Sequence, residues 1–239
     1  PVRAMDTRKG VGVPAGKVGA NGTASLQVGN TTIGSVTIPN GITAVAMNVT
    51  VTNPTMSGYL TVYPNSAASR PTVSNLNFSA NQTIANLVIV PVGADGKVDF
   101  FNGTSGTTDV IADVAGYFST GTSGAKYHAI GPDRVVDTRF GLGNGGPGSV
   151  GANGVLTLPV PASATAVLTN LTVASTTASG YLTAYPDPNR PTVSNLNFSA
   201  GQAVPNLAIV PNNGKVDFFN GSGGSLRLIV DLGGYFSAS

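Results

Sequence analysis

The chain contains no cysteine, no tryptophan and no glutamate, and His128 is its single histidine. The absence of cysteine excludes disulfides and thiolate metal sites, so core packing and backbone hydrogen bonds must stabilise the fold. All ten acidic residues are aspartates. Two carboxylates such as Asp6 and Asp113 could offer oxygens to Ca²⁺, but they lack the aspartate-rich loop of a calcium site. No metal and no cofactor is therefore expected.

Charge is also scarce. Charged residues make up 9% of the chain and the net charge is +2. This surplus is too small to attract nucleic acid or anionic lipid, so neither is expected as a partner. No apolar run approaches the length of about 18 residues that a membrane-spanning helix needs. The sequence therefore predicts no membrane span.

Glycine, threonine, serine, asparagine and valine are abundant. Straight-chain helix formers are few, whereas β-branched residues and turn formers dominate. This composition predicts an all-β fold.

One unit of sequence occurs twice. Residues 71–80 read PTVSNLNFSA, and the same ten letters return at 191–200. The flanking motifs repeat in the same order, with GYLTVYP matched by GYLTAYP and GKVDFFNG returning unchanged. We predict two tandem β-sandwich-like or small-barrel domains of about seven or eight strands each. Their expected bounds are 1–119 and 131–239, joined by a linker at 120–130.

Strict alternation supports the strand assignment. In residues 44–52 the apolar side chains Val45, Met47, Val49 and Val51 occupy every second position. This period predicts an antiparallel strand with one buried face. The first copy carries about ten extra residues, 29–38, which should form a surface hairpin or loop because added length costs little there.

Arginine and aspartate recur at the two ends of each copy. The cluster Arg-x-x-Asp-Thr-Arg opens each copy, and an aspartate lies in each closing strand. An aspartate there needs a partner if it is buried. We therefore predict that Arg8 pairs with Asp113 and Arg139 with Asp231, which would tie the first strand to the last. A ligand-gripping arginine is the alternative.

Hydrolase chemistry is weakly supported. A Ser-His-Asp arrangement needs a positioned imidazole, and His128 lies in the expected linker and is absent from the first copy. Glycoside hydrolysis needs a pair of carboxylates, for which Asp99 and Asp217 are the candidates. Both aspartates stand beside lysines near hairpin turns. This position favours a solvated surface, so we expect no enzyme activity.

Tyrosines are the candidate ligand-binding residues. Tyr59 and Tyr63 lie four positions apart on one strand face, and Tyr181 and Tyr185 repeat the spacing. They could form a sugar-stacking platform, or their rings could pack in the core with the hydroxyls at its margin. Asn75 and Asn77, with Asn195 and Asn197 in the second copy, could read a polar ligand or hydrogen-bond to strand-end backbone groups.

The order of these motifs resembles a repeat common in secreted proteins of actinobacteria and some other bacteria. The motifs are Arg-x-x-Asp-Thr-Arg, Gly-Tyr-Leu-Thr-x-Tyr-Pro, Arg-Pro-x-x-Ser-Asn-Leu-Asn-Phe, Asn-Leu-x-Ile-Val-Pro, Gly-Lys-Val and Asp-x-x-Gly-Tyr-Phe. In that family the repeat is an accessory module, often in tandem and often beside hydrolase or peptidoglycan-processing domains. The resemblance implies a secreted, cell-surface or extracellular location and a non-catalytic role, but it assigns no ligand.

Two functions fit these observations. The first is attachment to the cell wall or another polysaccharide through shallow polar and aromatic contacts repeated for avidity. The second is structural, in which modules associate with their own kind through sheet edges to form a filament or surface coat. The first predicts a glycan partner and the second a homo-oligomer.

Overall fold

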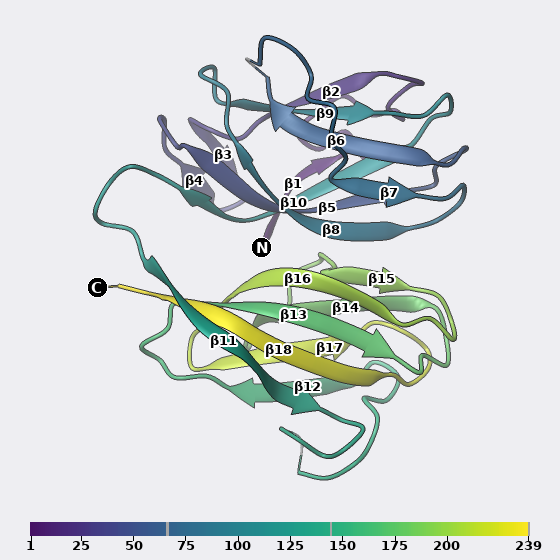
Figure 1. Ribbon diagram of the computed structural model, residues 1–239, viewed down its shortest axis with the longest axis vertical. Helices are drawn as coiled ribbons and strands as arrows, with labels where there is room; N and C mark the ends of the chain where they lie inside the picture. Colours follow the sequence, from purple (N-terminus) through teal and green to yellow (C-terminus); the bar gives the residue numbers. More distant parts are fainter. Residues whose placement is uncertain (66, 144, 239) are drawn as a thin grey trace. The chain divides into compact units, whose positions relative to one another are not determined.

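The computed structural model describes residues 1–65, 67–143 and 145–238. Within this part the chain forms β-strands, turns and loops without helix, which confirms the predicted all-β class. It divides into two compact units, one spanning Val2–Thr122 and the other running from Ser123 onward (Figure 1). No helix of membrane-spanning length and hydrophobicity occurs among the described residues.

The first domain is a sandwich of two four-stranded sheets plus a hairpin. One sheet has the order β1-β10-β5-β8 and the other β2-β9-β6-β7, while β3 pairs only with β4. The bounds are β1 Val2–Asp6, β2 Thr23–Gln27, β3 Thr31–Ile33, β4 Val36–Ile38, β5 Ala44–Thr52, β6 Gly58–Pro64, β7 Leu76–Phe78, β8 Ile84–Pro91, β9 Lys97–Asn102 and β10 Asp109–Phe118.

The second domain repeats this plan without the hairpin. Its sheets have the orders β11-β18-β13-β16 and β12-β17-β14-β15. The bounds are β11 Lys126–Asp137, β12 Val155–Pro159, β13 Ala166–Ala174, β14 Gly180–Pro186, β15 Leu196–Phe198, β16 Val204–Pro211, β17 Lys215–Asn220 and β18 Arg227–Ser237.

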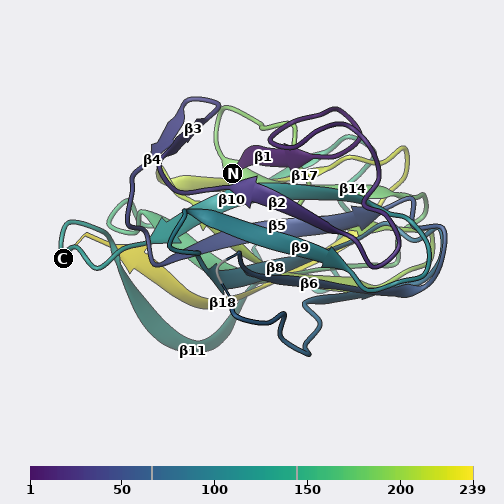
Figure 2. The same ribbon diagram turned by 90° about the horizontal axis from the view of Figure 1, so that it is seen from above.

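Both domains therefore have the topology of a jelly roll, in which eight strands form two packed sheets. In each domain the first strand pairs with the last, antiparallel, so the two ends of the domain lie beside each other in one sheet. Figures 1 and 2 show this arrangement most clearly for β11 and β18. The prediction of two β-sandwich domains is confirmed.

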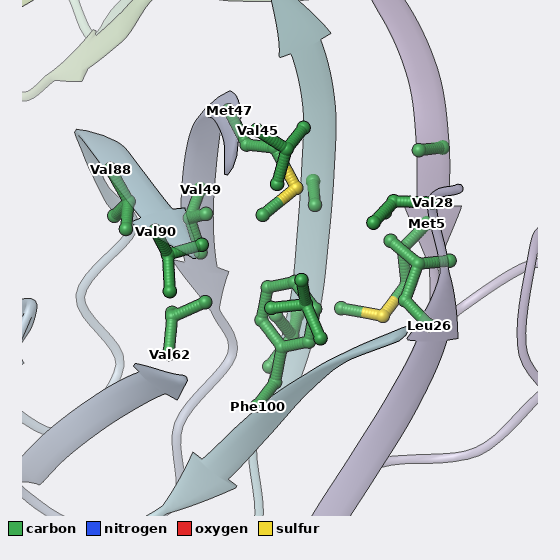
Figure 3. Packing of buried hydrophobic residues seen from close by; sticks show 14 of the residues in the cluster. Met5, Leu26, Val28, Val45, Met47, Val49, Val62, Val88, Val90 and Phe100 are labelled. Carbon is green, nitrogen blue, oxygen red and sulfur yellow. The ribbon is translucent and has the colours of Figure 1, made fainter. Parts of the chain in front are cut away.

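The core lies between the two sheets of each domain. In β5 the alternating side chains Val45, Met47, Val49 and Val51 are fully buried, as their period predicts. Figure 3 shows Met5 of one sheet beside Leu26 and Phe100 of the other. Phe218 holds the equivalent central position of the second core.

The extra residues of the first copy form the β3–β4 hairpin. This confirms the expected hairpin, although the hairpin does not lie only on the surface. Ile33 and Ile38 are buried and join the core, so the insertion adds apolar contacts at one end of the first domain.

The linker is shorter than the sequence suggests. Strand β10 ends at Phe118 and β11 begins at Lys126, so only residues 119–125 connect the two. Residues 126–130, expected in the linker, belong to a strand because Lys126 to Ala129 pair with the end of β18. Their sequence is less regular than that of β5, which is why period alone did not identify them.

Candidate functional site

An arginine and an aspartate from the first and last strands of the first domain form a bidentate ion pair. Arg3 lies directly opposite Asp113 in the β1–β10 register. Arg3 Nε donates to Asp113 Oδ1 at 2.9 Å, and Arg3 Nη2 donates to Asp113 Oδ2 at 3.2 Å. Such bidentate pairs are among the stronger and more specific polar contacts in proteins. This contact fastens the first strand to the last.

Arg8 does not make the predicted contact with Asp113. Its Nε donates to Asp6 Oδ1 at 2.9 Å and its Nη2 to Asp6 Oδ2 at 2.7 Å, while its own amide donates to Oδ1 at 3.1 Å. The reason is local. Strand β1 ends at Asp6, and the following turn, in which the amide of Lys9 donates to the Asp6 carbonyl, carries the Arg8 side chain back over Asp6.

The second domain has the same arrangement, and the predicted pairing differs from the structure there in the same way. Arg134, not Arg139, binds Asp231, with Nε–Oδ1 and Nη2–Oδ2 distances of 2.7 and 3.1 Å. Arg139 instead binds Asp137 at 2.9 and 2.7 Å. The strand-to-strand tie was therefore predicted correctly, but the wrong arginine of each motif was assigned to it.

The ion pairs and burial shift the pKa values of these aspartates. The Arg8 guanidinium holds the pKa of Asp6 below its usual value, and Arg139 does the same for Asp137. Burial raises the pKa of Asp113, although the Arg3 contact opposes the rise. The carboxylate oxygens are engaged by guanidinium groups, and nowhere in the described residues do three or more potential ligands gather in a metal-binding cluster.

A different cluster is repeated on the other sheet. It consists of Tyr59 on β6, Phe101 on β9 and Arg70 in the connection between β6 and β7; we refer to it and its second-domain equivalent as the Tyr–Phe–Arg clusters. The rings of Tyr59 and Phe101 are tilted by 49° with centroids 6.3 Å apart. The Arg70 guanidinium lies 3.7 Å from the Phe101 ring centroid. This is a cation–π distance.

In the second domain the cluster consists of Tyr181, Phe219 and Arg190. The tyrosine and phenylalanine centroids are 6.2 Å apart with an angle of 51°, and the guanidinium lies 3.7 Å from the phenylalanine ring. The two clusters therefore match in geometry as well as in sequence. Tyr181 keeps 37% of its surface exposed, and Arg190 is also exposed.

A glycine shapes each cluster. A Cβ atom placed on Gly103 would lie 2.3 Å from Cζ of Tyr59, and one on Gly221 would lie 2.3 Å from Cζ of Tyr181. The tyrosine ring therefore rests against the backbone at a position where only glycine leaves room. This contact fixes the orientation of a ring that still reaches solvent.

Asn75 binds the end of the connection between β6 and β7, the segment that contains Arg70. The amide of Val62 donates to Asn75 Oδ1 at 2.7 Å, and Thr61 Oγ1 donates to the carbonyl of Val73 at 2.5 Å. The amide of Ala184 makes the equivalent 2.7 Å bond with Asn195. The interpretation of Asn75 as a backbone-binding residue is thus confirmed. Its bonds hold the end of the connection between β6 and β7 against the backbone of β6.

Tyr63 and Tyr185 do not extend the exposed platform that their spacing suggested. Both side chains are buried, which leaves too little ring surface for a sugar to stack on. Burial and the nearby Asp217 raise the pKa of Tyr185. Strand alternation cannot reveal this burial, because it shows only on which face of a strand a side chain lies.

The candidate hydrolase residues also have structural partners. Asp99 is buried and accepts hydrogen bonds from Ser25 Oγ at 2.6 Å and Asn65 Nδ2 at 2.8 Å, and Asp217 accepts one from Thr157 Oγ1 at 2.6 Å. The expectation that they lie on a solvated surface is wrong, because residues from neighbouring strands and loops enclose them.

His128 lies at the end of the second domain where β11 meets β18. Its ring stacks on Tyr235 with centroids 4.9 Å apart, and its Nε2 lies 2.9 Å from Ser237 Oγ. Within the described residues no hydrogen bond joins this imidazole to a carboxylate. The residues that a Ser-His-Asp mechanism requires are therefore not assembled there.

Sequence reasoning missed the role of one asparagine in each copy. Asn102 Nδ2 lies within 3.2 Å of the carbonyls of Val18, Gly19 and Gly106, and Asn220 makes the equivalent contacts in the second domain. The signal was present in the identical GKVDFFNG segments. These bonds anchor the loop before β2 to the end of β9.

No family model and no curated protein matches the chain. Among solved structures, the CBM22-1–CBM22-2 tandem domain of Paenibacillus barcinonensis Xyn10C aligns at 10% identity over 91% of this chain and 85% of that chain, with a TM-score of 0.28. Sulfolobus Turreted Icosahedral Virus gives 13% identity, coverages of 93% and 58%, and a TM-score of 0.25. The major capsid protein P2 of bacteriophage PM2 gives 9%, coverages of 92% and 94%, and a TM-score of 0.21. Scores this low support no inference about function.

Proposed function

We propose that the chain is a non-catalytic, extracellular module that attaches to cell-wall or other polysaccharide through its two Tyr–Phe–Arg clusters. The observation that carries the proposal is the repetition in both domains of one arrangement, a partly exposed tyrosine and an exposed arginine around a buried phenylalanine, with centroid distances of 6.3 and 6.2 Å and identical 3.7 Å cation–π distances.

The chemistry of the cluster suits a sugar. A tyrosine ring that rests against glycine on one side can offer its other side to the apolar face of a pyranose, while its hydroxyl meets water or ligand. The exposed arginine has planar N–H donors that can reach sugar hydroxyls or carboxylates. The surroundings carry little charge, which favours a neutral or weakly charged polymer over nucleic acid.

Two equal sites in one chain favour a repetitive ligand. A polymer that engages both sites gains avidity, because the second contact forms at high effective concentration. A weak, shallow site can then suffice for stable attachment to an insoluble glycan. The resemblance of the motif order to a secreted accessory module supports the same role and the extracellular location.

The proposal includes the absence of catalysis. Asp99 and Asp217 are buried, one in each domain, and each is already hydrogen-bonded to a hydroxyl of its own sheet. This arrangement differs from the pair of carboxylates flanking a substrate bond that glycoside hydrolysis requires.

Retention on insoluble peptidoglycan and on other insoluble glycans tests the proposal. Wild-type protein should be retained on at least one of them, and Tyr59→Ala or Tyr181→Ala should reduce retention by about a hundredfold through loss of avidity. The double variant should not be retained. Phe140→Ala is the matched control, because Phe140 is an aromatic residue that is 76% exposed and lies outside both clusters. Equal retention of the double variant and the wild type would contradict the proposal.

A second candidate, a self-associating structural subunit, is favoured by the edge strands that each open sheet leaves, such as β7 and β8. Electron microscopy of purified protein distinguishes it. Ordered polymers together with no retention on any glycan would place this function first.

A further inference from the structure

Arg70 and Arg190 differ from the other five arginines of the chain. Those five all donate hydrogen bonds within the protein, to aspartates from Arg3, Arg8, Arg134 and Arg139 and to backbone carbonyls from Arg227. Within the described residues, Arg70 and Arg190 donate no hydrogen bond and form no ion pair. The two arginines with free donors therefore occupy the same position in the two copies.

Each of these guanidinium groups is nevertheless held in place by a ring. Both lie 3.7 Å from a phenylalanine centroid, and the rings of Phe101 and Phe219 are buried, with 8% and 7% of their surface exposed. A guanidinium that stacks on a ring uses its flat face, so its N–H donors remain available at its edges. Because Arg70 and Arg190 are exposed, these donors can meet a ligand from solvent.

The position of the guanidinium does not follow from the segment that carries it. Residues 64–69 precede Arg70 and read PNSAAS, whereas only residues 186–189, PDPN, precede Arg190. The distance to the phenylalanine ring is the same in both domains despite this difference in length and sequence. A side chain that only shields a ring needs no charge. The repeated geometry therefore points to a use for the free donors.

We propose that each Tyr–Phe–Arg cluster binds a sugar unit that carries a carboxylate, as the uronic acids of polysaccharides do; this inference rests on the proposed function. The tyrosine ring takes the apolar face of the sugar, and the guanidinium binds the carboxylate through two parallel hydrogen bonds. The tyrosine and the guanidinium lie against the same phenylalanine ring, so one sugar unit or two adjacent units reach both.

A carboxylate fits the cluster better than a neutral or a phosphate group. The planar fork of a guanidinium matches the two oxygens of a carboxylate, whereas a single sugar hydroxyl engages only part of it. Each cluster contributes one guanidinium, which balances the single negative charge of a carboxylate, and the net charge of the chain is only +2. A polymer in which acidic units alternate with neutral sugars also remains weakly charged.

Matched polymers test the inference on the full chain. Retention is measured on alginate and polygalacturonate gels, each compared with the same polymer after chemical reduction of its carboxyl groups to alcohols. We expect at least one acidic gel to bind the chain at least about tenfold more tightly than its reduced form, because the charged hydrogen bonds are lost on reduction. Added salt should weaken binding to the acidic gel more than binding to the reduced one.

Variants assign the preference for the acidic gel to the two arginines. The double variant Arg70→Gln/Arg190→Gln should bind both forms of the polymer equally. Arg70→Lys/Arg190→Lys should lose most of the preference as well, because lysine keeps the charge but not the bidentate fork. Lys9→Gln/Lys126→Gln is the control. It lowers the net charge as much as the glutamine variant does, at exposed lysines outside both clusters, and should keep the preference. Thermal unfolding curves like that of the wild type show that each variant is folded.

The outcomes separate this inference from the proposed function. Tyrosine-dependent retention on neutral glycans without preference for any acidic gel would overturn the inference and leave the proposed function in place. Retention on no glycan, acidic or neutral, would overturn both. The carboxylate assignment would also fail if a polyol phosphate polymer retained the chain and the polyuronates did not, or if the lysine control lost the preference as completely as the arginine variant.

Discussion

The two domains place a threonine at the same strand junction but surround it with opposite charges. In the first domain Thr7 Oγ1 donates to Asp109 Oδ1 at 3.1 Å and accepts from the amide of Val110 at 3.0 Å. In the second domain the amide of Leu228 donates to Thr138 Oγ1 at 3.0 Å. The residue at the position of Asp109 is Arg227, and its Nη1 donates to the carbonyl of Thr138 at 3.0 Å.

This difference shows which feature of the junction is the same in both domains and which one varies. A carboxylate only accepts hydrogen bonds and a guanidinium only donates them, so the threonine offers its hydroxyl to one and its carbonyl to the other. The bond that the amide of the second residue of the last strand donates to the threonine hydroxyl oxygen stays the same. The backbone junction is therefore the invariant feature of the two domains, whereas the sign of the neighbouring charge can change.

The strongest test of the comparison is removal of the central phenylalanine from one core. Phe100 and Phe218 are fully buried in separate cores, so Phe100→Ala should lower the free energy of unfolding of the first domain by about 4 kcal/mol. Phe218→Ala should do the same to the second domain. Hydrogen exchange measured in urea resolves the two domains. Equal destabilisation of both domains by either single variant would show that they do not unfold separately.

Acid should weaken both domains through Asp6 and Asp137. Both pKa values are lowered in the folded protein, so the stability that these carboxylates contribute is present above about pH 4 and is lost as the pH falls through the lowered values. The contribution of Asp113 to stability depends on pH in the opposite direction. Its pKa is raised, so its contribution is largest at low pH and is lost as the pH rises through the raised value.

Variants separate these effects. Asp6→Asn should cost about 2 kcal/mol at neutral pH, a value reduced from that of a fully buried pair because Arg8 is partly exposed. It should also flatten the acid dependence of the first domain in unfolding experiments from about pH 5 to about pH 2, whereas Asp113→Asn should steepen it. Asp95→Asn, in an exposed turn, is the control. An unchanged slope in Asp6→Asn would refute the assignment.

The smallest effect concerns the threonine junction. Thr7→Val removes a donor to Asp109 and the acceptor for the Val110 amide, whereas Thr138→Val removes only the acceptor for the Leu228 amide. Because a lost buried hydrogen bond costs on the order of 1 kcal/mol, Thr7→Val should be the more destabilising by about that amount. Urea midpoints of the two variants decide the matter, and equal losses would mean that the Asp109 contact contributes little.

The sandwich could be predicted from the sequence because the patterns that indicate it lie within short segments. Alternation in β5 and the duplicated segments depend only on which face of a strand is buried, and each pattern is complete within a few residues. The hairpin of residues 29–38 was predictable for the same reason, since the comparison of the two copies marks it as added length.

The site was predicted less well because it depends on register and on loop paths. Arg3 and Arg8 lie in one motif, and only the β1–β10 register shows that Arg3 faces Asp113. Tyr63 lies on the same strand face as Tyr59, for which an exposed platform and core packing were both open, and it is buried whereas Tyr59 is half-buried. Alternation places both rings on one face and cannot say which part of that face another segment covers.

The adjacency of first and last strands in each sandwich also determines how the chain would respond to tension. In the second domain Lys126, at the start of β11, lies opposite Ser237, at the end of β18. A pulling force applied through these two ends acts across the ladder, so its hydrogen bonds break one after another from the pulled end instead of sharing the load. A domain so anchored should yield at low force by peeling, and would act as an extensible link between whatever its two ends are attached to.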